Sequence, residues 1–310
     1  MSSIEKMMER LAQQNRENKV DVSADVVSEL LPERIAAMAV KNENENSSQK
    51  TNHDSDKEPL ELQLDRLVTS GYLPDNYEAS CQFNEFRKIK RPILKNAFSR
   101  EKNEGKLPQN LVLISSAVPG EGKTFCAINL TLNMILERDI TVMLMDADCI
   151  RRSLSKVFGV EKSAGLVDVL EGESEIENVI INTAIPQLKI FPAGRLHKHT
   201  AELLAGDRMK RLAVEIAERY ADRIILMDAP PLLAANDAEI LSHYAGQAII
   251  VVEAEKTSQS LIQQALMCID SEKTLTGLVL NKRQGGALAE YGGYDYYGDY
   301  NSGDDEPDKG

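Results

Sequence analysis

The stretch from Ser115 to Thr124, Ser-Ser-Ala-Val-Pro-Gly-Glu-Gly-Lys-Thr, constrains the fold of this chain more than any other. It follows the apolar run 111–114 and leads into a helix-forming segment. A short strand, a glycine-containing turn and a helix opened by Lys-Thr together predict a phosphate-binding loop. Glycine lets backbone N–H groups turn toward a phosphate, and the helix presents the positive end of its dipole. The alternative is an ordinary strand-to-helix turn in which Gly-Lys-Thr occurs by chance.

Each residue type in this loop has a chemical use. Lys123 would reach the β- and γ-phosphates of a nucleotide, and the Thr124 hydroxyl would hold Mg²⁺. Ala117 stands where such loops usually have their first glycine, and the substitution costs little if φ there is negative. The residues expected to contact the nucleotide are Pro119, Gly120, Glu121, Gly122, Lys123, Thr124 and Phe125.

Length and composition narrow the functional class. With 310 residues the chain has ample length for a buried core in one large or two small domains. A net charge of -13 argues against sequence-independent binding to nucleic acid, which needs a basic face. No run of about 18 apolar residues and no cleavable leader is evident, so a cytoplasmic protein is expected. Four widely spaced cysteines without a Cys-x-x-Cys pair predict reduced thiols rather than a disulfide framework or a metal site.

The N-terminal region, 1–59, is expected to be mostly disordered. Residues 1–11 carry an apolar stripe at helical spacing, but residues 41–59 contain no apolar side chain that could offset the cost of ordering. The stripe predicts a short helix. This helix either packs on its own domain or, because a polar linker follows it, docks on a partner.

A catalytic domain is expected from residue 60 to residue 284. It begins with an amphipathic helix, 82–98, which contains Pro92, a residue expected at a kink or a helix start. The basic face of this helix is either solvated or a subunit contact, and it consists of Arg87, Lys88, Lys90, Arg91 and Lys95. Continuous apolar runs predict strands buried on both faces at 111–114, 141–145, 188–191, 224–227, 248–252 and 275–280. Helices are expected between them at 124–138, 152–158, 201–221, 237–244 and 258–271. This alternation predicts a three-layer α/β domain with a mostly parallel sheet and its ligand beyond the carboxyl ends of the strands.

Acidic residues follow two of the predicted strands. Asp146 and Asp148 come after 141–145, and Asp228 comes after 224–227. A carboxylate at such a strand end, beside a phosphate loop, is placed to hold Mg²⁺ or its waters. The alternative is that each aspartate only ends a strand or caps a helix.

The last segment, 285–310, changes character. It is rich in Gly and Asp and contains five of the nine tyrosines of the chain: Tyr291, Tyr294, Tyr296, Tyr297 and Tyr300. Nothing apolar lies nearby to pack them, so an exposed, disordered tail is expected. Clustered exposed tyrosines beside acids are hydroxyl substrates or stacking groups.

In combination these motifs resemble the bacterial tyrosine autokinases, P-loop kinases that regulate capsule and exopolysaccharide export. The resemblance rests on 117–124 as the Walker A motif, 142–148 as the A-prime motif, 224–228 as the Walker B motif, and the tyrosine cluster. The segment 86–92 looks most like the soluble form found beside exosortase-type exopolysaccharide loci. In that form the membrane-spanning activator is a separate polypeptide.

The resemblance implies an ATP- and Mg²⁺-dependent, non-specific protein-tyrosine kinase that phosphorylates its own tail. It implies Lys123 on the phosphates and Asp146 as the acid nearest the attacking hydroxyl. The implied metal-site residues are Thr124, Asp146, Asp148 and Asp228. The implied partners are further copies of the chain, a membrane-bound polysaccharide co-polymerase as activator, and a phosphotyrosine phosphatase.

Two departures from the family pattern leave questions open. The oligomerisation motif Glu-x-x-Arg-x-x-Arg is here Asn84-x-x-Arg87-x-x-Lys90, and the arginine after the A-prime acids comes one residue late, as Arg151-Arg152. Two other functions are also open. A partition-type positioning ATPase would have a lysine where Val118 stands and would lack the tyrosine tail. A nucleotide-sensing scaffold would use the same loop with little catalysis.

Overall fold

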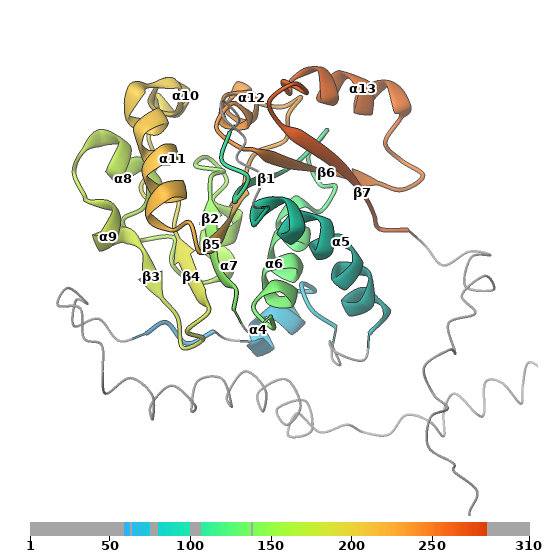
Figure 1. Ribbon diagram of the computed structural model, residues 1–310, viewed down its shortest axis with the longest axis horizontal. Coiled ribbons are helices and arrows are strands. Elements are labelled where there is room, and N and C mark those ends of the chain that lie inside the picture. Colours follow the sequence, from blue (N-terminus) through green and yellow to red (C-terminus); the bar gives the residue numbers. More distant parts are fainter. Residues whose placement is uncertain (1–58, 63, 75–79, 100–106, 138, 284–310) are drawn as a thin grey trace, which may run out of the picture.

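A computed structural model describes residues 59–62, 64–74, 80–99, 107–137 and 139–283. The predictions for the N-terminal helix, the polar linker and the tyrosine cluster lie outside these residues. Figure 1 shows a central sheet with helices on both faces. The three-layer α/β fold predicted from the sequence is therefore confirmed.

Seven strands form the sheet within the described residues, in the order β3-β4-β2-β5-β1-β6-β7. Their bounds are β1 Leu111–Ser116, β2 Thr141–Asp146, β3 Ile181–Asn182, β4 Leu188–Phe191, β5 Arg223–Asp228, β6 Gln247–Glu253 and β7 Leu275–Asn281. All neighbours are parallel except β3 and β4. Every residue of β1 is buried between β5 and β6, so the strand that leads into the predicted loop lies inside the sheet.

The helices form two layers (Figure 1). One contains α4 Leu64–Thr69, α5 Cys81–Ala97, α6 Lys123–Met134 and α7 Ser153–Val157, whose buried side chains pack with Val112 and Ile114 of β1. The other contains α8 Leu166–Glu171, α9 Ile176–Val179, α10 Thr200–Ala205, α11 Asp207–Arg219, α12 Asn236–Ser242 and α13 Gln259–Met267, which pack with Leu111 and Leu113. Alternate side chains of one strand thus enter opposite layers. None of these described helices is long and apolar enough to cross a membrane.

Helix α5 begins at Cys81, one residue before its predicted start, and Ser80 caps it by accepting a hydrogen bond from the Phe83 N–H. Pro92 lies inside the helix, which excludes the helix start, one of its two expected positions. Lys90 is buried, not solvated: its ammonium donates to the Asn133 carbonyl at 2.8 Å and pairs with Glu137 at 2.7 Å. The exposed basic face therefore consists of Arg87, Lys88, Arg91 and Lys95.

The predicted helix 201–221 is in fact two helices, α10 and α11, separated by Gly206. Gly206 has extended backbone, with φ −76° and ψ 162°, which ends α10 and starts α11 in a new direction. The short helices α8 and α9 and the antiparallel strand β3 were not predicted. These elements are so short that their sequences carry little periodic signal.

Strand β7 was expected to be buried on both faces and is not. Among the described strands it pairs only with β6, at the edge of the sheet, and Leu278 and Leu280 are 54% and 63% exposed. A continuous apolar run does not distinguish an edge strand from a central one. The position of β7 is decided by tertiary pairing.

Candidate active site

The predicted loop runs from the end of β1 to the start of α6. Gly120 and Gly122 have φ of +91° and +96°, a region that glycine enters without steric cost. Among the described residues other than glycine, positive φ occurs only at Arg152, Glu255 and Lys282, so the Ala117 methyl group is tolerated as expected. Pro119 and Gly120 are exposed at the tip, and the chain then enters the protein.

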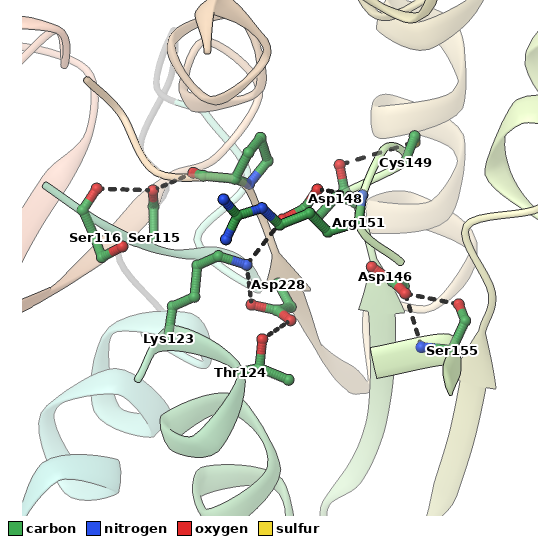
Figure 2. Close-up of polar contacts among 12 residues, drawn as sticks. Ser115, Ser116, Lys123, Thr124, Asp146, Asp148, Cys149, Arg151, Ser155 and Asp228 are labelled. Atoms are coloured by element: carbon green, nitrogen blue, oxygen red, sulfur yellow. Dashed lines mark hydrogen bonds and ion pairs between the residues drawn. The ribbon is translucent and has the colours of Figure 1, made fainter. Parts of the chain in front are cut away.

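Lys123 is the first residue of α6 and its side chain is buried. Its ammonium lies 3.1 Å from an Asp148 carboxylate oxygen and 3.5 Å from an Asp228 carboxylate oxygen. The next residue, Thr124, donates its hydroxyl to the other Asp228 oxygen at 2.7 Å (Figure 2). The structure therefore brings the loop lysine, the loop threonine and two of the three predicted acids into direct contact.

Asp146 lies on the neighbouring strand. Asp146 of β2 and Asp228 of β5 are register partners, so both strands end at the same edge of the sheet. One Asp146 oxygen accepts hydrogen bonds from the Ser155 N–H and hydroxyl, each at 2.7 Å, and Figure 2 shows this pair beside the lysine cluster. Its other oxygen, Oδ1, is buried and has no hydrogen-bond partner among the described residues. A buried carboxylate oxygen without a partner is costly and calls for a ligand, a proton or water.

The cluster is electrostatically unbalanced, because one ammonium faces three buried carboxylates. Burial lowers the pKa of Lys123, but the charges of Asp228 and Asp148 outweigh burial and the pKa is raised, so the lysine stays charged. Burial, together with the nearby Asp228, raises the pKa of Asp146 to about 7. Burial also raises the pKa of Asp228, although Lys123 and Thr124 oppose this. A cluster with excess negative charge beside a helix N-terminus suits a complex of phosphates with a divalent cation.

Sequence reasoning missed several residues that shape this site. Ser155 fixes Asp146, and its position at the start of α7, nine residues downstream, gave no separate signal. Glu121 was expected only as a nucleotide contact, yet its carboxylate accepts the Val118 N–H of its own loop at 2.7 Å and the Thr257 hydroxyl. Asn281 and Lys282, at the end of β7, bond to loop carbonyls. The contacts of Glu121 with Thr257, and of Asn281 and Lys282 with the loop, join segments far apart in the chain, so no local spacing reveals them.

Sequence comparison gives the site a family context. A family model described as AAA domain matches residues 110–279. Tyrosine-protein kinase YwqD of Bacillus subtilis (strain 168) is 32% identical over 188 residues, which cover 60% of this chain and 77% of that protein. Tyrosine-protein kinase ptk of Acinetobacter johnsonii is 31% identical over 176 residues, 56% of this chain but 24% of that protein. The chain thus spans about a quarter of the length of the latter relative.

Solved structures share the fold. The kinase domain of Escherichia coli tyrosine kinase ETK superposes with a TM-score of 0.56 at 20% identity, covering 78% of this chain and 89% of that one. The chimerical protein CapA2B2 gives a TM-score of 0.59 at 22% identity, covering 74% and 95%. At these identities the likeness shows a common P-loop fold.

Proposed function

The chain belongs to the bacterial tyrosine kinase family, and from this premise we propose that it is an ATP-dependent protein-tyrosine autokinase. The observation that carries the proposal is the buried contact of Lys123 and Thr124 with strand-end carboxylates at a phosphate-binding loop. A partly exposed loop tip lets a nucleotide enter, while the reacting groups lie in a buried, low-dielectric setting. Charges positioned in such a setting act strongly on a phosphoryl group in transfer.

The nucleotide would bind through backbone N–H groups of 120–125, next to Pro119 at the loop tip, and through the ammonium of Lys123. That ammonium is already ordered by Asp148 and Asp228, so it needs little reorganisation to donate to the β- and γ-phosphates instead. The helix that begins at Lys123 adds the positive end of its dipole.

The oxygens around Thr124 fit a hard divalent cation. Thr124, Asp146, Asp148 and Asp228 would hold Mg²⁺ or its waters, and the partnerless Asp146 oxygen is one donor still available. In the nucleotide-free protein, no three His, Cys, Asp or Glu side chains of the described residues lie close enough together to bind a metal ion by themselves. The phosphates of the nucleotide would therefore supply part of the coordination. Bound Mg²⁺ would neutralise charge on the phosphates during transfer.

Asp146 is the proposed proton acceptor for the tyrosine hydroxyl. A tyrosine hydroxyl is a weak nucleophile near neutral pH, and a carboxylate that takes its proton late in transfer assists the reaction. In the metal-free protein, burial and the nearby Asp228 raise the pKa of Asp146 to about 7, so its carboxylate binds a proton more readily than that of an ordinary aspartate. Ser155 holds its other oxygen and so fixes the direction of the free one.

The proposed acceptors are Tyr291, Tyr294, Tyr296, Tyr297 and Tyr300. We propose that transfer occurs between subunits, with the tail of one copy entering the site of a neighbour. Each phosphate adds about -1.5 to -2 charges at neutral pH, so a phosphorylated tail would be repelled from an acid-lined site. Unphosphorylated protein should therefore associate and phosphorylated protein should disperse.

The biological role proposed is regulation of exopolysaccharide polymerisation and export. The membrane-bound co-polymerase that activates such kinases would be a separate partner, docking on residues 1–11 or on the exposed basic face of α5. This arrangement predicts a cytoplasmic kinase that is peripheral at the membrane, and a phosphotyrosine phosphatase that resets it.

The test is incubation of the full chain with ATP and Mg²⁺, followed by phosphotyrosine mapping by mass spectrometry. Phosphate should appear on the tail tyrosines and be absent from Lys123→Met protein. To test transfer between chains, active protein with all five tail tyrosines changed to Phe is mixed with Lys123→Met protein, which should then become phosphorylated. ATP hydrolysis without any phosphotyrosine would contradict the kinase and favour the positioning ATPase.

A further inference from the structure

The end of β7 contacts the tip of the phosphate-binding loop. The Lys282 ammonium donates to the Gly120 carbonyl at 2.6 Å, and the Asn281 side-chain amide donates to the Glu121 carbonyl at 2.8 Å. Two consecutive residues of one segment therefore hold two consecutive carbonyls of the other. Lys282 also lies 3.2 Å from the carboxylate of Glu253, at the end of β6.

Glu121 ties the same loop to its surroundings from inside. Its side chain is buried, and one oxygen accepts the Val118 N–H while the other accepts the Glu253 N–H at 3.3 Å and the Thr257 hydroxyl. The loop, the end of β6 and the end of β7 are thus joined in one hydrogen-bonded network. The network lies opposite the Asp146, Asp148 and Asp228 side of the loop.

Backbone conformation shows how closely these segments fit. Lys282 has φ +58°, a left-handed conformation that costs energy for a residue with a Cβ. A Cβ added at Gly122 would lie 2.2 Å from the Asn281 amide nitrogen. Gly122 is therefore needed both for its own positive φ and for the approach of Asn281. We refer to Asn281 and Lys282 as the latch.

The latch fixes the direction of the loop N–H groups through peptide geometry. In a trans peptide the C=O and the following N–H lie in one plane and point in opposite directions. Holding the Gly120 carbonyl sets the direction of the Glu121 N–H, and holding the Glu121 carbonyl sets that of the Gly122 N–H. We propose that the latch residues are positioning residues that aim these N–H groups at the nucleotide phosphates. This inference rests on the proposed nucleotide site.

Nucleotide binding and formation of the latch are thermodynamically linked. If the latch favours the loop shape that binds nucleotide, nucleotide must stabilise the latch by the same factor. The latch immediately precedes the segment that carries the tyrosine tail, because the chain continues from Arg283 into 285–310. Nucleotide occupancy would therefore be coupled to the point from which the tail departs.

The experiment measures ADP-Mg²⁺ affinity by titration calorimetry on the full chain. Lys282→Ala should weaken binding about three- to tenfold, as expected for one charge-assisted hydrogen bond on a partly exposed side chain, and Lys282→Arg should recover part of the loss. The matched control is Lys256→Ala. Lys256 lies 3.2 Å from the same Glu253 carboxylate and is exposed, but it makes no contact with the loop within the described residues. Its removal should leave ADP affinity unchanged.

Hydrogen–deuterium exchange of residues 275–283, measured with and without ADP, distinguishes a positioning role from a purely structural one. A purely structural role of Lys282 would leave the effect of ADP on the exchange rate unchanged. ADP should slow exchange there in the wild-type and Lys256→Ala proteins and have a smaller effect in Lys282→Ala. Equal ADP affinity in Lys282→Ala and wild type, or equal losses in both variants, would overturn the latch while leaving the kinase proposal intact. Wild-type protein that bound no ADP would instead contradict the proposed function.

Discussion

The two ends of α6 each hold a buried lysine, and the contrast between them separates a structural charge from a functional one. At the C-terminal end, Lys90 reaches across from α5 to the Asn133 carbonyl and to Glu137. At the N-terminal end, Lys123 belongs to the helix itself and faces the carboxylates of Asp148 and Asp228. The two residues are 5% and 8% exposed, so burial alone does not distinguish them.

The helix dipole explains the difference. A cation is stabilised at the C-terminal end of a helix, where carbonyls lack intrahelical partners, and Lys90 satisfies one of them. A cation at the N-terminal end is disfavoured by the same dipole, so Lys123 depends on nearby acids. The acids in turn exceed the single ammonium. Balanced contacts mark Lys90 as structural, and the imbalance around Lys123 marks a site prepared for a ligand.

The largest expected effect comes from removing the charge at the N-terminal end. Lys123→Met keeps the apolar stem and should lower autophosphorylation at least about 10²–10³-fold, the typical cost of losing one preorganised electrostatic contact to a transition state. The measurement is the initial rate of phosphotyrosine formation, with circular dichroism to check folding. A folded variant with wild-type activity would contradict the assignment of Lys123.

Removing one acid should make the surroundings of Lys123 resemble those of Lys90. In the unfolded chain Asp146 ionises near its ordinary value of 3.8, whereas in the folded, metal-free protein its pKa is about 7. Between about pH 4 and pH 7 Asp146 is protonated in the folded protein but ionised in the unfolded chain. The free energy of unfolding of the wild-type protein should therefore fall as pH rises from about 4 to 7. Asp146→Asn should remove this decline and raise stability by up to about 4 kcal/mol at pH 8, while activity is lost.

Urea denaturation at several pH values measures this effect. Ser155 would remain hydrogen-bonded to the amide oxygen, so the local structure should persist. If Asp146→Asn were less stable than wild type across the whole range, the ionised carboxylate would be structural.

The matched change at the other end is Lys90→Met. The apolar stem is kept, but the Asn133 carbonyl loses its buried donor, at a cost of about 1–3 kcal/mol in unfolding free energy. The specific activity of the folded variant should equal that of wild type. A loss of activity larger than the loss of folded protein would show that the two ends are coupled.

The smallest effect is expected from Glu137→Gln. Glu137 is 48% exposed on its side chain, and its pairing with Lys90 is therefore worth less than about 1 kcal/mol. Equal destabilisation by Glu137→Gln and Lys90→Met would mean that the ion pair, rather than the helix carbonyl, holds Lys90.

The sequence predicts the N-terminal end of α6 well and the C-terminal end poorly, for a physical reason. A strand, a Gly-containing turn and Lys-Thr are consecutive, and parallel strands bring their carboxyl-terminal acids to one edge, so Lys123, Asp146 and Asp228 could be predicted to lie together. Lys90 was predicted to lie on a basic face that is either solvated or a subunit contact, because the pattern of charges along the helix carries no information about a carbonyl 43 residues away.

Other errors share this cause. A single glycine is tolerated inside a helix, at a cost of about 1 kcal/mol, so Gly206 did not reveal the break between α10 and α11. The apolar run of β7 is compatible with either an edge or a central strand. The latch joins Lys282 to Gly120, which lies 162 residues earlier in the sequence. For β7 and the latch the deciding contact is tertiary, while the residues themselves are ordinary for their local pattern.

The central position of β1 also bears on how the protein is made. This strand hydrogen-bonds to β5 and β6 and to no other described strand, with Leu111 opposite Ile225 and Val112 opposite Gln247. Strands β5 and β6 are synthesised long after the phosphate-binding loop. Pairings between strands so distant in sequence form slowly. The loop therefore lacks the strands on both sides of β1 until residue 253 has been made, so the proposed nucleotide site would be among the last parts of the domain to be completed.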